Sequence, residues 1–164
     1  MDEEWAPTFD LDRLPHAGRG DPFHFHVYFK AETEAVFAVR LRATMLSTFH
    51  FLADRGIFMK AGFLHPSPMF VVAIDKKSDR GKVNDVIEWL EANRKGLSVL
   101  VHPHTTDGFV DDHTTHEVWL GTPLELGVIP TLRRVQRWLP STPVLLGGCA
   151  LAAVLMWRKH SRAV

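Results

Sequence analysis

Histidine is the residue whose number and spacing stand out in this chain. Of its ten histidines, eight lie between His24 and His116. A neutral imidazole binds iron, zinc, copper and nickel, and it exchanges protons near neutral pH. Each histidine taken alone is explained at least as well without a functional role, as a surface residue or as a hydrogen-bonded strand residue. Their convergence predicts a metal site with acid/base groups beside it.

Two of these histidines belong to the segment 23–29, FHFHVYF, in which apolar and polar residues alternate. Alternation is typical of a half-buried strand, because successive side chains point to opposite faces. We expect His24, His26 and Tyr28 on one face, with the two histidines roughly 6.5–7 Å apart along the chain. That spacing suits one metal ligand and one neighbouring histidine that contacts either the substrate or a metal-binding side chain.

The remaining segments predict further strands and helices. They are a helix over 31–55 that stops at Gly56, a hairpin of strands 57–64 and 69–74, a helix over 82–95, and strands 97–101 and 117–120. This order predicts an α+β fold of the ferredoxin-like split βαβ kind. Its antiparallel sheet would carry two helices on one face and an added C-terminal strand.

The predicted topology brings distant histidines together. In this fold the first strand runs antiparallel to 97–101, so the start of one lies beside the end of the other. His24 or His26 then approaches His102, where the polar loop 103–115 begins. Non-haem Fe(II) oxygenases commonly use two histidines and one carboxylate. The carboxylates nearby in sequence are Asp107, Asp111, Asp112 and Glu117.

We assign roles to the site residues from this geometry. The predicted metal ligands are His26, His102 and His113. The predicted catalytic acid/base or substrate-orienting groups are His24, His65 and His116. The predicted substrate-binding groups are Tyr28 and His104. The expected cofactor is non-haem Fe(II), with zinc as an ion that the purified protein can carry instead.

His65 fits this arrangement poorly. It lies between the two hairpin strands, and a hairpin tip belongs at the opposite end of the sheet from His102. His65 then reaches the site from a second subunit, or the strand limits differ from those predicted. His16, His50 and His160 fall outside the predicted site, and we assign them no function.

Composition narrows the classes of function. Lysine plus arginine and aspartate plus glutamate both number 19, so the net charge is zero and offers no basic field for nucleic acid. The single cysteine, Cys149, and the acidic start of the chain favour a cytoplasmic, reducing location. We expect a small-molecule substrate and a homodimer.

Three regions are predicted along the chain. Residues 1–22 are expected to form a mobile arm, residues 23–126 the domain, and residues 127–164 an extension with an apolar helix. The apolar part, 144–157, is shorter than the ~20 residues of a spanning helix, although residues 138–143 bring it close. A membrane anchor and a helix that docks on this domain or a partner remain equal alternatives.

Four stretches, FHFHVYF, LHPSPMF, WLEANRKGLSVLVHPHT and DDHTTHEVWLG, resemble the DOPA 4,5-dioxygenase family in order and spacing over residues 23–126. The resemblance implies a small ferredoxin-like protein that opens the catechol ring of DOPA by extradiol cleavage. In the implied mechanism a histidine moves a proton while catechol and O₂ are held at Fe(II). The chain departs from the family pattern at His104 and Thr106, usually Asn and Gly, and at Phe63-Leu64, usually Gly-Pro.

Two classes of function therefore stand. The first is a metal-dependent extradiol dioxygenase that acts on DOPA or a related catechol. The alternative is a non-enzymatic ferredoxin-like dimeric module that binds a ligand. Either one can be tethered to a membrane by the C-terminal extension, and fold alone does not separate them.

Overall fold

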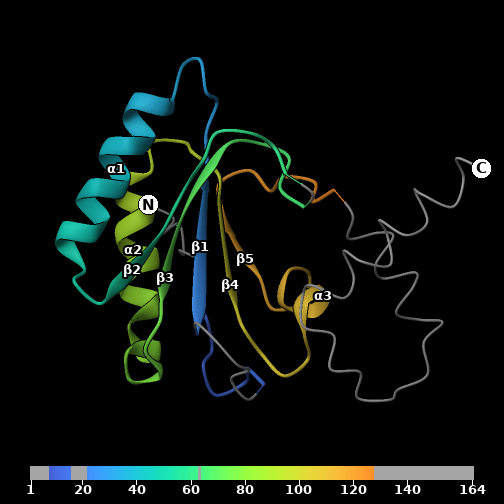
Figure 1. The fold of residues 1–164 in the computed structure, drawn as a ribbon. Helices are drawn as coiled ribbons and strands as arrows, with labels where there is room; N and C mark the ends of the chain where they lie inside the picture. The colour runs from blue at the N-terminus through green and yellow to red at the C-terminus, as the bar shows by residue number, and fades with distance from the viewer. Residues whose placement is uncertain (1–7, 16–21, 63, 128–164) are drawn as a thin grey trace, which may run out of the picture. The chain divides into compact units, whose positions relative to one another are not determined.

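A five-stranded antiparallel sheet is the centre of the computed structural model, which describes residues 8–15, 22–62 and 64–127. The strands are β1 (Phe23–Tyr28), β2 (Leu52–Phe58), β3 (Met69–Ile74), β4 (Val99–Pro103) and β5 (Val118–Leu120), and their order across the sheet is β2-β3-β1-β4-β5 (Figure 1). The helices are α1 (Ala35–Thr48), α2 (Val83–Asn93) and α3 (Phe109–Asp112), and a 3₁₀ helix (Lys77–Lys82) leads into α2. The α+β prediction is confirmed.

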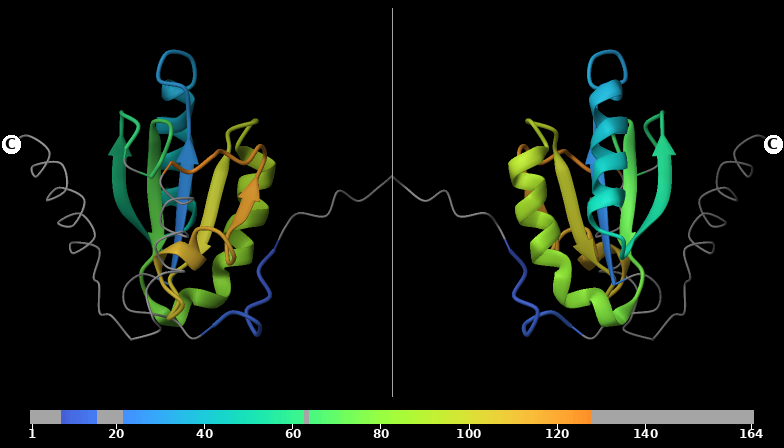
Figure 2. Two further views of the ribbon diagram at one scale, coloured as in Figure 1. Left: turned by 90° about the vertical axis from the view of Figure 1, so that its right-hand side faces the viewer. Right: turned by 90° about the vertical axis from the view of Figure 1, so that its left-hand side faces the viewer.

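One face of the sheet carries the main core. Phe23, Phe25 and Val27 of β1 are fully buried on this face, as the alternating pattern predicts. They pack in one cluster with apolar residues of α1 and α2, including Met45 and Ile87. Both helices lie across this side of the sheet in Figure 2. Each such side chain contributes about 1.5–3 kcal/mol by burial.

The first helix is shorter than predicted, and the second strand begins earlier. α1 ends at Thr48, and β2 starts at Leu52, inside the segment expected to be helical. Gly56 is a site of irregular strand pairing, with a φ of +103°, and not a helix stop. Its N–H donates to the Asp54 carboxylate at 2.9 Å. Pairing with the fully buried β3 therefore overrides the helical pattern.

The opposite face of the sheet is covered by loops. The segment between β2 and β3 and the segment after β5 meet there, because Gly127 N–H donates to the Leu64 carbonyl at 2.9 Å. A second apolar cluster forms beneath them, and it consists of Tyr28, Leu64, Met69, Val71, Leu100 and Leu126. In Figure 1, α3 lies on the side of the sheet opposite α1 and α2. This second face carries the histidines.

The two terminal regions are described only in part. Phe9, within the segment predicted as a mobile arm, is buried against Phe23 with ring centroids 4.9 Å apart. Its main chain exchanges two hydrogen bonds with the Asn84 side chain. The predicted apolar helix of the extension lies outside the described residues. Within the described ranges, no helix combines the length and apolarity needed to cross a membrane.

Candidate metal centre

Six imidazole rings gather on the second face of the sheet. His24 and His26 come from β1, His102 and His104 from the end of β4 and the residue after it, His65 from the loop before β3, and His113 from the end of α3. His26 is central, with ring centroids of the others at 4.5 Å (His65), 5.1 Å (His102), 5.7 Å (His24) and 6.2 Å (His113). The His104 ring lies 4.4 Å from that of His24.

Strand register explains how β1 and β4 contribute. His24 pairs directly with His102 across the antiparallel ladder, and His26 pairs with Leu100. Side chains of paired residues point to the same face, so the His24 and His102 rings lie 5.5 Å apart. The predicted approach of the first strand's histidines to His102 is confirmed.

Three of the rings have one nitrogen held by a partner around the cluster. His102 Nδ1–H donates to the Pro103 carbonyl at 3.0 Å, and His113 Nδ1–H donates to the Phe109 carbonyl at 2.8 Å. A carbonyl can only accept, so both rings carry their proton on Nδ1 and their lone pair on Nε2. His65 Nδ1 lies 2.7 Å from the Tyr28 hydroxyl. Metal-binding histidines are usually held through their second nitrogen in this way.

His26 is held differently. Its Nε2 lies 3.1 Å from His102 Nε2. Because His102 Nε2 has no proton, the His26 Nε2–H must be the donor, and this leaves the lone pair of His26 on Nδ1. His26 Nδ1 is buried, and no group among the described residues hydrogen-bonds to it. Two nitrogens bound to one ion at about 2.0–2.1 Å lie about 2.9–3.4 Å apart, so the His26–His102 spacing also fits two ligands of one metal.

Burial keeps these histidines neutral. Removal from water, with a smaller contribution from the neighbouring His24, lowers the pKa of His65 to about 4. The pKa of His113 is also lowered to about 4, mainly by removal from water, although its hydrogen bond to the Phe109 carbonyl opposes the shift. Burial, and then the neighbouring histidines, lowers the pKa of both His26 and His102 well below the ordinary value. A neutral imidazole is the form that binds metal. These four rings, His26, His65, His102 and His113, are therefore in their metal-binding form at neutral pH.

Two groups of three histidines bring their ligand atoms within 4.8 Å of one another. One consists of His24, His26 and His102, and the other of His26, His65 and His113. Neither contains a carboxylate, so the described residues present an all-histidine centre. Iron, zinc, copper and nickel accept imidazole ligands, and a three-histidine set leaves open positions for substrate.

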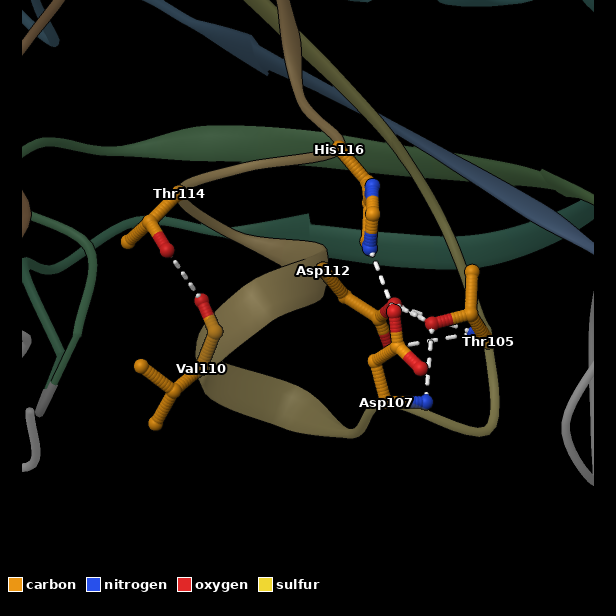
Figure 3. A network of polar contacts seen from close by, with 6 residues as sticks. All are labelled: Thr105, Asp107, Val110, Asp112, Thr114 and His116. Carbon is orange, nitrogen blue, oxygen red and sulfur yellow. Dashed lines mark hydrogen bonds and ion pairs between the residues drawn. The ribbon is translucent and has the colours of Figure 1, made fainter. Parts of the chain in front are cut away.

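Two of the carboxylates predicted to lie nearby, Asp107 and Asp112, hold the loop after β4 in place (Figure 3). The buried Asp112 carboxylate accepts hydrogen bonds from Thr105 N–H at 3.0 Å and from Thr105 Oγ1–H at 2.6 Å. Asp107 accepts a hydrogen bond from His116 Nε2 at 2.9 Å. Burial raises the pKa of Asp112, and the Thr105 hydrogen bonds oppose that effect. This network fixes the loop that leads into α3 and His113.

Tyr28 joins the cluster to the second apolar core. Its hydroxyl contacts His65, and its ring stacks on Trp119 with centroids 5.8 Å apart. Burial raises the pKa of Tyr28, so the phenol stays protonated at neutral pH. Leu64 and Leu100 pack in the same apolar cluster. The histidines therefore border an apolar surface on one side.

The placement of His65 corrects one expectation. The hairpin tip does lie at the Tyr28 end of β1, away from His102, but no second subunit is needed to bring His65 to the site. β2 ends at Phe58, and the segment before β3 turns back over the sheet through a Gly62 N–H bond to the His65 carbonyl at 2.9 Å. Burial of Leu64 in the second apolar cluster accompanies this fold-back.

The structure brings seven of the eight predicted site residues together. His26, His102 and His113 are the buried histidines among them, and His24, His65, His104 and Tyr28 surround these three. His116 is the exception, because its described contact is with Asp107 in the loop network. The individual roles of all eight stay predictions. His50 is exposed in the turn after α1.

Sequence reasoning missed one residue that shapes the site and gave another a different role. Phe109 holds His113 through its carbonyl, and its half-exposed ring lies 4.3 Å from the His113 ring. Asp112, one of the carboxylates near the predicted site, accepts hydrogen bonds from Thr105. The four-residue spacing of Phe109 and His113 and the glycine before Phe109 are the signals that indicate a short helix here.

Comparisons with known proteins show which chains this one is similar to. The model of the Dopa 4,5-dioxygenase family matches residues 23–129. An uncharacterized 21.2 kDa protein of Botryotinia fuckeliana is 32% identical over 122 residues, which cover 68% of this chain and 65% of that protein. A crystal structure of a candidate dioxygenase from Nostoc punctiforme is 36% identical, with a TM-score of 0.59 over 71% of this chain and 94% of its own. The chain thus spans about two thirds of the fungal relative's length.

Proposed function

Because this chain belongs to the Dopa 4,5-dioxygenase family, we propose that it is a metal-dependent extradiol dioxygenase that opens the ring of DOPA or a related catechol with O₂. One observation carries the proposal. Neutral histidines from β1, β4, α3 and the loop before β3 converge on one face of the sheet, where a core would ordinarily be apolar. A buried polar cluster of this size needs a function, because it contributes less stability than apolar packing.

The ferredoxin-like class is part of the same proposal. The element order β1-α1-β2-β3-α2-β4 and the neighbour order β2-β3-β1-β4 support it, with β5 as the added strand beside β4. In this arrangement both helices cover one face of the sheet. The other face is left for the site.

The residues present fit an Fe(II) ion. They supply neutral nitrogen ligands, and two rings have their Nε2 lone pairs fixed by main-chain carbonyls. A bound Fe(II) ion supplies the Lewis acidity and the open coordination positions that ring cleavage by O₂ requires. Both oxygen atoms enter the product, so the overall reaction needs no external reductant.

The chain's own groups supply binding and proton transfer. A catechol must lose a hydroxyl proton as it binds, and histidines of the cluster such as His24 and His65 are the acceptors. The Tyr28 hydroxyl at 2.7 Å holds the orientation of the His65 ring. The apolar surface beside Tyr28 and Trp119 holds the substrate ring and excludes water.

The experiment is an anaerobic Fe(II) reconstitution followed by a panel of catechols that includes DOPA and caffeate. We expect one Fe(II) per chain, O₂ consumption equal to the substrate consumed, and a yellow ring-opened product. His26→Ala should lose the metal and all turnover, because His26 belongs to both candidate ligand groups. His50→Ala, at an exposed histidine outside the cluster, is the matched control and should behave as wild type.

The alternative function has its own outcome in this experiment. Protein that binds Fe(II) and a catechol, yet consumes no O₂ across the panel, is a ligand-binding module and not an oxygenase. The expected homodimer and the membrane contact of the extension stay predictions, and size measurement and membrane partitioning of the full chain test them.

A further inference from the structure

We propose that Phe109 is a substrate-binding residue of the histidine cluster, and that its ring contacts the aromatic ring of a bound catechol. The inference rests on the catechol binding proposed above. It goes further by naming a side chain that distinguishes a catechol from a chelator without a ring.

Phe109 lies directly beside one buried histidine of the cluster. Its ring centroid is 4.3 Å from that of His113, and the two ring planes are inclined by 39°. The Phe109 carbonyl accepts a hydrogen bond from His113 Nδ1–H at 2.8 Å, so Nε2 is the nitrogen of His113 that can bind a metal. A chelating ligand on a metal bound by His113 would therefore be a close neighbour of the Phe109 ring.

The Phe109 ring is half-exposed beside these buried polar rings. Its side chain is 50% exposed, whereas Phe23, Phe25 and Phe70 of the central strands are fully buried. A single exposed apolar side chain is ordinary on a protein surface. The location of Phe109 distinguishes it, because its ring lies against a candidate metal ligand and still has surface open to a second flat ring.

The main chain around Phe109 is fixed by hydrogen bonds. In α3, Asp112 N–H donates to the Gly108 carbonyl at 3.0 Å, and His113 N–H donates to the Phe109 carbonyl at 3.3 Å. The Asp112 carboxylate joins this helix to Thr105 (Figure 3). An aromatic ring that is held in place loses little conformational entropy when it binds a partner. Phe109 is therefore a preorganised contact for a ligand.

This contact is expected to be selective for aromatic ligands. Two aromatic rings attract each other in offset-stacked or edge-to-face arrangements, with centroids about 4.5–7 Å apart. A chelator without a ring can bind the same metal through two oxygens, but it gains nothing from Phe109. The Phe109 side chain should also leave metal binding unchanged, because the carbonyl that holds His113 remains when this side chain is removed.

The test uses the zinc-loaded full chain, because zinc accepts imidazole ligands and has no redox chemistry that would consume the ligand. Binding of 4-nitrocatechol is followed by its visible absorption. Binding of acetohydroxamate, a chelator with two oxygens and no ring, is followed by displacement of 4-nitrocatechol. Phe109→Ala should weaken the binding of 4-nitrocatechol about 10-fold and leave the binding of acetohydroxamate and the zinc content unchanged.

Further variants separate loss of the aromatic contact from loss of the fold. Phe109→Tyr keeps the aromatic ring and should bind both chelators as wild type does. Phe109→Leu keeps an apolar side chain without the ring, should bind 4-nitrocatechol more weakly than wild type, and tests the same contact if Phe109→Ala does not fold. Val36→Ala, at an exposed apolar residue of α1, is the control and should match wild type. Circular dichroism checks the fold of each variant.

Each contrary result has a distinct meaning. Equal affinity of wild type and Phe109→Ala for 4-nitrocatechol would overturn the contact. Equal weakening of both chelators, or loss of zinc from a folded Phe109→Ala, would also overturn it, because the side chain would then act only by supporting His113. In these cases the proposed function stands, since wild type binds the catechol. If wild type binds no metal, or binds zinc but neither chelator, the proposed function fails and this contact fails with it.

Discussion

Acidification of the metal-free protein is expected to lower its stability through the buried histidines. His113 is the best case for a magnitude, because it is buried and its pKa is lowered from 6.5 to about 4. Above pH 6.5 both the folded and the unfolded chain have a neutral His113, so it contributes no pH dependence. Between pH 6.5 and 4 the unfolded chain binds a proton that the folded chain does not.

The size of the effect follows from that difference in proton binding. At pH 5 an unfolded histidine of pKa 6.5 is mostly protonated, while one of pKa about 4 is mostly neutral. The free energy of unfolding then falls by about 2 kcal/mol for this one group. His26 and His102 have pKa values lowered in the same direction, so their contributions add to the loss on acidification.

The assay is urea unfolding in EDTA at pH 7.5 and pH 5.0, for wild type and for His113→Gln. The stability of wild type should drop more between the two pH values than that of the variant, by about 2 kcal/mol. His50→Gln is the matched control at an exposed histidine. An equal drop in wild type and His113→Gln would refute the reasoning, because it would mean that His113 titrates alike in the folded and unfolded chains.

Three further changes test other parts of the structure. Asp112→Ala should lower the free energy of unfolding in urea by about 2–3 kcal/mol, because the buried Thr105 N–H and hydroxyl lose their acceptor. An unchanged unfolding midpoint would mean that water replaces the carboxylate. Gly121→Ala should lower the free energy of unfolding by about 1–3 kcal/mol, because its φ is +77° and an added Cβ would lie 2.5 Å from Arg94 Nη1. No change in that free energy would show that the backbone accepts the side chain and that Arg94 moves aside. A chain that ends at residue 127 should keep its circular dichroism, melting temperature and metal content, and early melting or aggregation would show that the extension covers part of the domain.

Sequence predicted the strands of the centre of the sheet better than its edge. The bounds 69–74 agree with β3, because this strand is buried at every residue and prolines precede it. The edge strand β2 was missed at its start because Asp54 and Arg55 interrupt the apolar pattern. Gly56 adds a signal that is typical of a helix end. Pairing with β3, a contact distant in sequence, decides its conformation instead.

The site was predictable as far as strand geometry determines it. Alternation placed His24 and His26 on one face, and antiparallel pairing brought His102 to them. The position of His65 was not predictable from local sequence. It depends on the packing of Leu64 and on the hydrogen bond from Gly127 N–H to the Leu64 carbonyl, and these two residues are 63 positions apart (127 − 64). The division of the histidines into two groups depends on the orientations of their rings. Main-chain carbonyls orient the rings of His102 and His113, and no sequence pattern reveals the positions of these carbonyls.

The partners that orient the rings also limit how this centre can change in evolution. His102 and His113 are held by carbonyls of the main chain, and no amino-acid replacement at Pro103 or Phe109 deletes a carbonyl. The partner of His65 is a side chain, the Tyr28 hydroxyl, and a single codon change to phenylalanine removes it. Mutation can therefore change the orientation of the His65 ring readily, through Tyr28. The main-chain contacts of His102 and His113 remain for as long as the fold persists.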